Sequence, residues 1–284
     1  KGGRAMFERA SNGWELAKSS WRVLKMDKEL LVFPLLSGLA CLVVLASFAL
    51  PLRGTDYVHA VLEEEGAPTD PVAWLLLLAF YFANYFVIVY FNAALIACAI
   101  IRFRGGDPTL ADGFRAATSR LPQILAWAAL TATVGTVVKV IESRSERLGR
   151  VAAGLFGMAW SAATYFVVPV LVVEKVGPVA AVRRSLSILR KAWGEALAAE
   201  FGIGLIVFLA IVVAAIPAGL GLLFGQVAAT MIGVGLSAVL IVLVALVSSA
   251  LNSIVVAALY DYAVGHAPAA AFDADALRGA FVAR

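Results

Sequence analysis

The chain has 284 residues, of which 62% are hydrophobic and only 15% are charged, and its mean hydropathy is +0.91. A soluble domain is typically about half apolar and a quarter charged, so this composition predicts a polytopic membrane protein. The formal net charge is +4, and the basic residues flank apolar runs. No soluble basic domain is predicted, which argues against a nucleic-acid partner.

The chain opens with an amphipathic segment at residues 7–24. Its apolar residues recur every three or four positions, as on one face of a helix; they are Phe7, Ala10, Trp14, Ala17, Trp21 and Leu24. The apolar run at 30–52 follows and exceeds the roughly 20 residues that cross a bilayer. A polar segment, 53–70, separates it from a second predicted span at 71–101.

A second amphipathic segment lies at residues 105–121. Gly105 and Gly106 predict a turn, Asp107 an N-cap and Pro108 the first residue of a helix. The apolar stripe of this helix is Leu110, Phe114, Ala117 and Leu121. Two further spans are predicted, at 122–141 and 151–173, with a short charged turn between them.

A third amphipathic segment starts at Gly177 and Pro178. Its stripe is Val179, Val182, Leu186, Leu189 and Trp193. Spans five and six are predicted at 197–223 and 228–259, before a polar tail at 260–284. Gly221 and Gly225 have the spacing of small residues at helix interfaces, which predicts close packing of these two spans.

These elements predict an all-α polytopic membrane protein with six transmembrane helices in three hairpins. Each hairpin is preceded by a cytoplasmic amphipathic interfacial helix. The whole chain is expected to form a single membrane domain, with repeated units at about 6–101, 105–173 and 177–259 and a C-terminal tail at 260–284. The pattern supports repeated supersecondary units more firmly than an ancestral triplication, and a six-span protein without a true repeat is the alternative.

The distribution of Lys and Arg predicts the orientation. Eighteen of the 23 Lys and Arg residues fall in four segments that would share one side of the membrane: 1–29, 102–120, 174–197 and 258–284. Because positively charged loops remain in the cytoplasm, both termini are predicted there.

The amphipathic helices have two interpretations. As surface helices, their apolar stripes lie among acyl chains and their cations meet anionic headgroups. As core helices, they pack beneath the bundle as a collar. We favour the first, because Trp14, Trp21 and Phe114 are typical of membrane interfaces. It predicts contacts with anionic lipid at Arg183, Arg184, Arg190 and Lys191.

Residues suited to catalysis are few. The two histidines, His59 and His266, are far apart in the sequence, and both cysteines, Cys41 and Cys98, fall inside apolar runs. Neither arrangement has the spacing of a metal site or a catalytic triad. We therefore expect no cofactor, no metal and no enzymatic activity.

Polar residues inside the predicted spans are the remaining site candidates. They form a candidate intramembrane polar layer, whose members are Asn84, Tyr85, Asn92, Thr164, Tyr165, Asn252 and Ser253. One interpretation is that they line a solute path. The other, which we favour because no ionisable residue lies mid-span, is that they form interhelical hydrogen bonds.

Several short segments are distinctive: residues 105–113 (GGDPTLADG), 120–125 (RLPQIL), 166–171 (FVVPVL), 192–195 (AWGE) and 258–262 (ALYDY). Together they resemble an uncharacterised family of prokaryotic six-span membrane proteins, catalogued only as a domain of unknown function, over most of the chain from Met6 to about Tyr262. The resemblance implies the fold and a prokaryotic inner membrane, but no activity. There is a looser likeness to the membrane domain that accompanies some glycerophosphodiester phosphodiesterases, without the metal-binding residues of the hydrolase.

The function predicted from these observations is a non-enzymatic integral membrane scaffold or accessory protein that organises lipid or a membrane partner. Its expected partners are membrane lipids, with anionic headgroups foremost, and a membrane protein or a second copy of the chain. The alternative is a pore or transporter for a small or amphipathic solute, lined by polar residues of spans two and six. The near-absence of mid-span charge favours the first.

Overall fold

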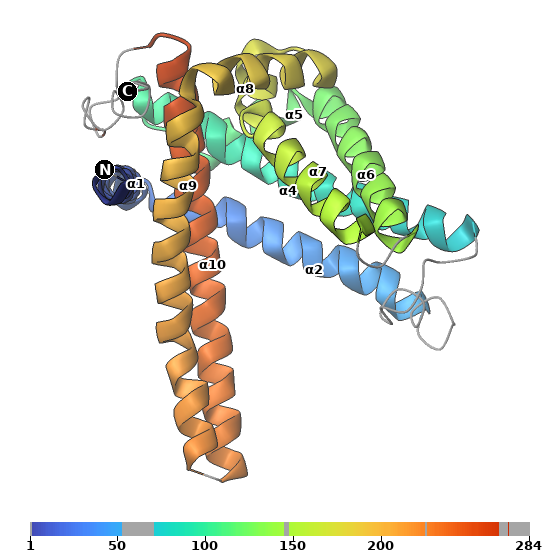
Figure 1. Cartoon of the computed structure of the whole chain (residues 1–284), viewed down its shortest axis with the longest axis vertical. Coiled ribbons are helices and arrows are strands. Elements are labelled where there is room, and N and C mark those ends of the chain that lie inside the picture. Colours follow the sequence, from blue (N-terminus) through green and yellow to red (C-terminus); the bar gives the residue numbers. More distant parts are fainter. Residues whose placement is uncertain (1, 53–70, 145–147, 225, 267–271, 273–284) are drawn as a thin grey trace. The chain divides into compact units, whose positions relative to one another are not determined.

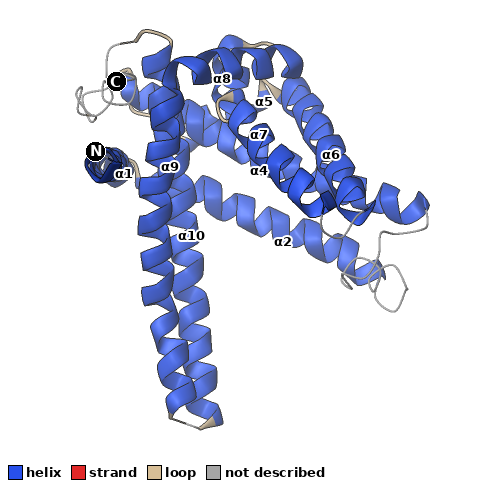
Figure 2. Cartoon of the chain, viewed as in Figure 1, coloured by secondary structure: helices blue, strands red, loops and turns tan. Residues whose placement is uncertain are grey.

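The computed structural model describes residues 2–52, 71–144, 148–224, 226–266 and 272. Its regular secondary structure in these residues is helical throughout (Figure 1 and Figure 2). The elements in chain order are α1 (Gly2–Met26), the 3₁₀-helix η1 (Lys28–Leu31), α2 (Val32–Leu52), α4 (Pro71–Phe103), α5 (Leu110–Thr118), α6 (Leu121–Arg144), α7 (Leu148–Thr164), α8 (Val167–Glu174), α9 (Pro178–Leu223) and α10 (Val227–Ala263).

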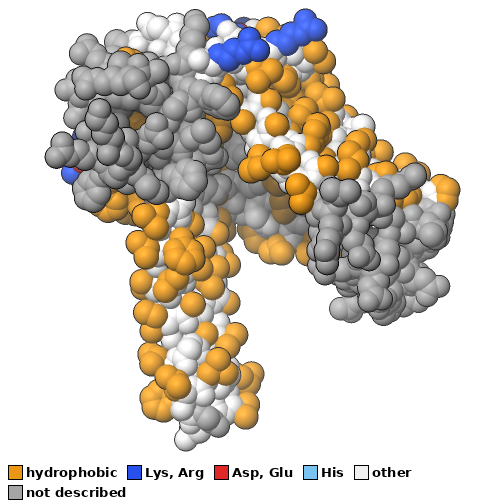
Figure 3. All heavy atoms as spheres, in the orientation of Figure 1, with side chains coloured by type: hydrophobic (Ala, Val, Ile, Leu, Met, Phe, Trp, Pro, Cys, Tyr) orange, Lys and Arg blue, Asp and Glu red, His pale blue; other side chains and the backbone are white. Residues whose placement is uncertain are grey.

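Six helical segments are long and apolar enough to cross a membrane, which confirms the predicted number and supports a multi-pass membrane protein. They are Lys28–Leu52, Pro71–Phe103, Leu121–Ile141, Val151–Glu174, Gly204–Leu223 and Val227–Ala263. Large apolar side chains cover the visible parts of α9 and α10 (Figure 3). Phe208 in α9 and Ile232 in α10 are 62% and 72% exposed, as expected of helices surrounded by acyl chains.

The fourth predicted span is not one continuous helix, because the chain breaks between α7 and α8 at Tyr165 and Phe166. Pro169 causes the break: it has no backbone N–H, and its ring crowds the carbonyl group of Tyr165, four residues earlier. The backbone N–H of Phe166 donates instead to the hydroxyl of Ser185 in α9, at 3.0 Å. Ser185 is fully buried, so its hydroxyl replaces a helix hydrogen bond in an apolar surrounding.

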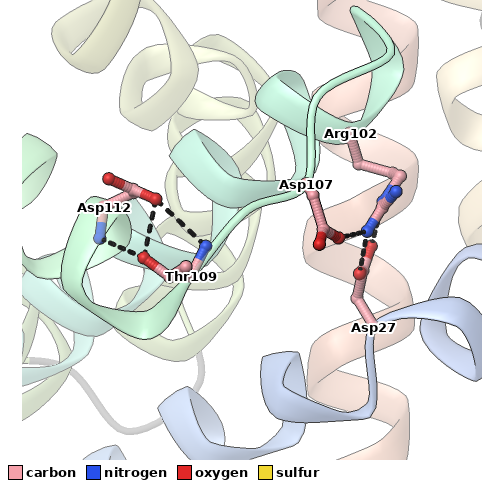
Figure 4. A network of polar contacts seen from close by, with 5 residues as sticks. All are labelled: Asp27, Arg102, Asp107, Thr109 and Asp112. Atoms are coloured by element: carbon pink, nitrogen blue, oxygen red, sulfur yellow. Dashed lines mark hydrogen bonds and ion pairs between the residues drawn. The ribbon is translucent and has the colours of Figure 1, made fainter.

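The predicted start of the second amphipathic helix is wrong. The helix α5 begins at Leu110, and its N-cap is Thr109, not Asp107. Thr109 and Asp112 form a capping box: the Asp112 N–H donates to the Thr109 hydroxyl, and the Thr109 N–H donates to the Asp112 carboxylate (Figure 4). These hydrogen bonds from Thr109, together with the charge of Arg115, hold the pKa of the Asp112 carboxyl below its usual range.

The third predicted amphipathic segment and the fifth predicted span form one helix, α9, which begins at Pro178 as predicted. Pro217 lies inside α9 and has no N–H to donate. The next N–H, that of Ala218, donates to the hydroxyl of Ser237 in α10 at 2.9 Å. A serine of the following helix therefore compensates for the proline, as Ser185 does at the α7/α8 break.

The chain divides into two compact units. The first consists of Lys1–Pro34, Cys98–Pro108 and Arg190–Arg284, and the second of Leu35–Ala97 and Thr109–Leu189. In the first unit, α1 packs against α10 and η1. The end of α10 is enclosed by protein, since every residue from Ser253 to Asp261 is buried.

The packed face of α1 does not coincide with the predicted apolar stripe. From Trp14 to Met26, where the side chains are described, the buried residues are Leu16, Ala17, Ser19, Ser20, Val23 and Leu24. Trp14 and Trp21 belong to the predicted stripe, yet they are 56% and 41% exposed. The side chains of Phe7 and Ala10, at the start of that stripe, lie outside the described part of the chain. The helix therefore packs through one face and presents its tryptophans on another.

The helices α9 and α10 approach each other closely at two glycines in the first unit. A Cβ atom at Gly221 would lie 2.6 Å from the carbonyl oxygen of Ala229, and one at Gly233 would lie 2.3 Å from that of Pro217. Backbone contact of this kind is possible only without a side chain. The predicted close packing of these helices is confirmed at Gly221, whereas Gly225 lies outside the described residues.

In the second unit, α6 packs against α7, and the rings of Trp127 and Trp160 stack with centroids 6.0 Å apart. The helix α5 packs on α4 through Phe114, whose ring centroid is 6.4 Å from that of Tyr90 and 6.2 Å from that of Phe91. The apolar stripe of α5 thus contacts protein, as the core-helix interpretation expects.

The glycine contacts predict a specific loss of stability. Gly233→Ala forces a Cβ atom into the Pro217 carbonyl oxygen, and overpacking of this kind costs about 1–3 kcal/mol. Thermal unfolding in detergent should show a lower melting temperature for Gly233→Ala and Gly221→Ala. Gly235→Ala is the control, because its Cβ atom would meet open space and should keep or raise stability. Equal effects at all three glycines would contradict the close approach.

Candidate functional site

A polar network centres on Arg102 at the end of α4 (Figure 4). Its guanidinium donates to both carboxylate oxygens of Asp27, with 2.5 Å between Nε and Oδ2. Nη2 of Arg102 also donates to Asp107, in the loop after α4. Asp27 lies between α1 and η1 and its side chain is only 8% exposed. One cation therefore neutralises a buried carboxylate and orients the loop that leaves α4.

This bidentate geometry gives the contact its strength and direction. A planar guanidinium matches the two oxygens of a carboxylate, and such charge-assisted pairs are about twice as strong as neutral hydrogen bonds. Because Asp27 is largely buried, removing Arg102 would leave a carboxylate with neither water nor a cation. The network thus fixes the junction of α1 and η1 to the end of α4 within the first unit.

A second charged cluster lies at the end of α10, also in the first unit. The Asp261 carboxylate is 7% exposed, and its Oδ1 lies 3.5 Å from Nη2 of Arg104 and 3.0 Å from Nδ1 of His266. The contact with Arg104 is ionic, and that with His266 becomes ionic when the imidazole is protonated. Both clusters lie at helix ends, where charged groups in a membrane protein are least costly.

Sequence reasoning missed both clusters. It included Arg102 and Arg104 only in the count of basic residues on one side of the membrane, and it assigned Asp107 to a helix cap. Asp27 carried one usable signal, since it is an acidic residue in a basic segment directly before an apolar run. Its partner, however, is 75 positions away, and no local pattern connects the two.

The candidate intramembrane polar layer is divided between the units. Asn84, Tyr85, Asn92, Thr164 and Tyr165 belong to the second unit, where all five are partly buried. Nδ2 of Asn84 donates to the Phe80 carbonyl at 2.9 Å, and the Thr164 hydroxyl donates to that of Trp160 at 2.8 Å. These two side chains therefore bond to their own helices, one turn earlier.

The remaining members of the layer, Asn252 and Ser253, belong to α10 in the first unit. The Ser253 hydroxyl is buried and donates to the Ser249 carbonyl at 3.0 Å, again one turn earlier in the same helix. The Asn252 side chain is exposed. Within each unit, the hydrogen bonds of Asn84, Thr164 and Ser253 thus stay inside a single helix.

The predicted lipid-binding cations differ in their surroundings. Arg183 and Arg190 are exposed on α9. Nε of Arg184 donates to the Glu174 carboxylate at 2.8 Å, so Arg184 is held by protein. The side chain of Lys191 lies outside the described residues. Lys and Arg side chains gather along the edge formed by the start of α9 (Figure 3).

In the part of the chain that the structure describes, no group of three His, Cys, Asp or Glu side chains could hold a metal ion.

Comparison with known proteins gives one match, to a family of unknown function (DUF6159) over residues 72–269. The chain belongs to this family. The match runs from α4 to the end of α10 and includes Arg102, Asp107 and Asp261, whereas Asp27 precedes it. No curated protein and no solved structure matches the chain. Membership of DUF6159 confirms the predicted uncharacterised family and assigns no activity to it.

The Arg102 network predicts a strong coupling between two distant positions. Arg102→Gln should destabilise the protein by about 3 kcal/mol, because it leaves the buried Asp27 carboxylate unpaired. The double variant Asp27→Asn/Arg102→Gln should cost less than the sum of the single variants. Denaturation in mixed detergent micelles measures these costs.

Arg115→Gln is the control for that cycle, because it removes the same charge from a 79% exposed side chain and should cost less than about 1 kcal/mol. Strictly additive costs for Asp27→Asn and Arg102→Gln would show that the pair does not stabilise the fold.

Proposed function

We propose that this DUF6159 protein is a non-enzymatic integral membrane scaffold or accessory protein that organises lipid or a membrane partner. The observation that carries the proposal is the way in which polar side chains inside the spans are satisfied. Asn84, Thr164 and Ser253 each donate to a carbonyl of their own helix, one turn earlier. In each side chain one donor is thereby directed at the helix backbone and not at a solute path.

The position of charge supports the same function. Asp27, Arg102 and Asp261 lie at helix ends and are engaged in ion pairs within the first unit. A transporter commonly needs an ionisable group along its path, where protonation or ion binding drives the cycle. Charges that instead join helix ends stabilise a fixed architecture, as a scaffold requires.

Exposed cations in the second unit supply a surface for anionic lipid. Arg115 in α5, Lys175 at the end of α8 and Arg183 in α9 are all exposed. Each cation near an anionic bilayer surface contributes about 1 kcal/mol of attraction. Arg184 is assigned a structural role, because its side chain is 41% exposed and its guanidinium lies 2.8 Å from the Glu174 carboxylate. Arg115 pairs with Asp112 at 3.2 Å, but at 79% exposure this pair is only weakly coupled.

The proposal includes a location and an orientation. We place the protein in the inner membrane of a prokaryote, with its six spans in three hairpins, each preceded by a cytoplasmic amphipathic helix, and both termini in the cytoplasm. The orientation is supported by the distribution of positive charge: 18 of the 23 Lys and Arg residues lie in the segments that are assigned to the cytoplasmic side. The likeness to membrane domains that accompany glycerophosphodiester phosphodiesterases fits an accessory role.

Cysteine labelling tests the orientation. In a variant without Cys41 and Cys98, Ala10→Cys should react with an impermeant maleimide only from the cytoplasmic side. Glu64→Cys should react only from the opposite side, because residues 53–70 contain a single basic residue. Intact cells and inverted vesicles give the two directions of labelling. The reverse pattern would overturn the orientation.

Reconstitution tests the function. Liposomes that contain the purified protein should release entrapped ions and small dyes no faster than empty liposomes. The triple variant Asn84→Leu/Thr164→Val/Ser253→Ala should remain folded, because an intramembrane hydrogen bond contributes only about 0.6 kcal/mol on average. The parent protein should melt at a higher temperature in phosphatidylglycerol than in phosphatidylcholine.

The variant Asn84→Leu/Thr164→Val/Ser253→Ala also distinguishes a scaffold from a pore or transporter. Protein-dependent flux that is lost in this variant would contradict the scaffold and establish a pore or transporter lined by these residues. The variant Arg115→Gln/Lys175→Gln/Arg183→Gln should lose the lipid-dependent rise in melting temperature. A rise that is equal in both lipids would remove the lipid-organising part of the proposal.

A further inference from the structure

The outward face of α1 combines tryptophans with cations. Trp14 and Trp21 are 56% and 41% exposed, and Met26 is 57% exposed. Lys18, Arg22 and Lys25 are exposed on the same helix. At 100° per residue all six fall within an arc of about 140°, opposite the buried face that packs against α10 and η1. We name these six residues the tryptophan–cation face.

The contacts of this face leave most of its positive charge available. Lys25 Nζ lies 5.6 Å from the centre of the Trp21 ring, so it is oriented by a cation–π contact and keeps its charge. Arg22 donates to the neutral hydroxyl of Ser19 at 3.2 Å. Lys18 lies 3.9 Å from the Glu15 carboxylate, an exposed pair that is only weakly coupled.

The chain itself places this face beside a membrane. The helix α1 ends at Met26, and a candidate membrane span begins at Lys28. The Asp27/Arg102 pair fixes this junction, so the end of α1 stays next to the start of the span. Lys25 and Met26 are therefore within a few residues of the hydrocarbon boundary.

We propose that the tryptophan–cation face binds the anionic headgroups of the bilayer that the protein spans. Its residues differ from the cations Arg115, Lys175 and Arg183 of the second unit, and the inference rests on the proposed function only for the membrane location. Tryptophan is enriched at the headgroup level, where its ring is partly buried and its N–H remains hydrated. Lys18, Arg22 and Lys25 complement the phosphate charge, at about a fivefold gain in binding for each cation.

The packing of α1 against protein determines how deeply this helix can enter the bilayer. Leu16, Val23 and Leu24, the residues that would anchor a free amphipathic helix in acyl chains, are buried against protein. Among the α1 side chains that the structure describes, from Trp14 to Met26, the large apolar residues left for the bilayer are Trp14, Trp21 and Met26. This part of the helix therefore contacts headgroups without inserting, and its attachment depends on charge and not mainly on apolar burial.

A spin label at Met26→Cys, in the full-length protein without Cys41 and Cys98, tests this contact. The protein is reconstituted into phosphatidylcholine with and without a quarter of phosphatidylglycerol. Access of a neutral nickel chelate to the label is then measured. Phosphatidylglycerol should lower that access by about twofold or more, and about 1 M salt should restore it by screening. Lys18→Gln/Arg22→Gln/Lys25→Gln should abolish the response.

The matched control is Arg115→Gln/Lys175→Gln/Arg183→Gln, which removes the same charge from the second unit and should keep the full response at the label. Melting temperatures in detergent check that both triple variants fold. Equal access in the two lipids, or a response that survives loss of the α1 cations, would overturn the inference. Protection that rises with protein concentration in neutral micelles would assign the face to a second copy, and also overturn it. A negative result here leaves the flux experiment unaffected, since the label reports only on α1.

Discussion

The satisfaction of backbone hydrogen bonds in an apolar surrounding is the constraint on which the rest of the structure depends. A helix meets this constraint along its length, and a proline interrupts it. Near Pro169 and Pro217, the N–H groups of Phe166 and Ala218 donate to serine hydroxyls of the following helix. Each serine therefore acts as a hydrogen-bond acceptor at a helix defect. These polar side chains thus form hydrogen bonds with the backbone.

The apolar surrounding also restricts where charged side chains can lie. An ionised group within the hydrocarbon would have to be paired or reach water, and both solutions are easier at a helix end. Asp27 and Asp261 are both nearly buried, and each has an arginine from the end of α4 within ion-pair distance. The two arginines are Arg102 and Arg104, separated by one residue. One short segment of chain thus contacts both the α1/η1 junction and the end of α10 in the first unit.

Local patterns predicted the parts of this fold that depend on local physics. Six spans followed from apolar runs of sufficient length, and the start of α9 at Pro178 followed from the suitability of proline for the first turn. The hydrogen bond from Phe166 to Ser185 and the Asp27/Arg102 pair join residues 19 and 75 positions apart, so no periodicity contained them. The candidate polar layer could have been judged better, because Ser and Thr in helices commonly bond to the carbonyl four residues earlier.

The length of α10 connects these observations to the membrane surface. Its 37 residues extend about 55 Å, whereas the hydrocarbon core of a bilayer is about 30 Å thick. The exposed apolar residues from Val227 to Leu243 suit the hydrocarbon, and the enclosed segment from Ser253 to Asp261 suits a protein layer at its edge. The helices α1 and η1 pack on α10, and α1 turns its tryptophans and cations away from that contact. A helix fixed in this way meets headgroups at a depth set by the fold, because Leu16, Val23 and Leu24 are already used in packing.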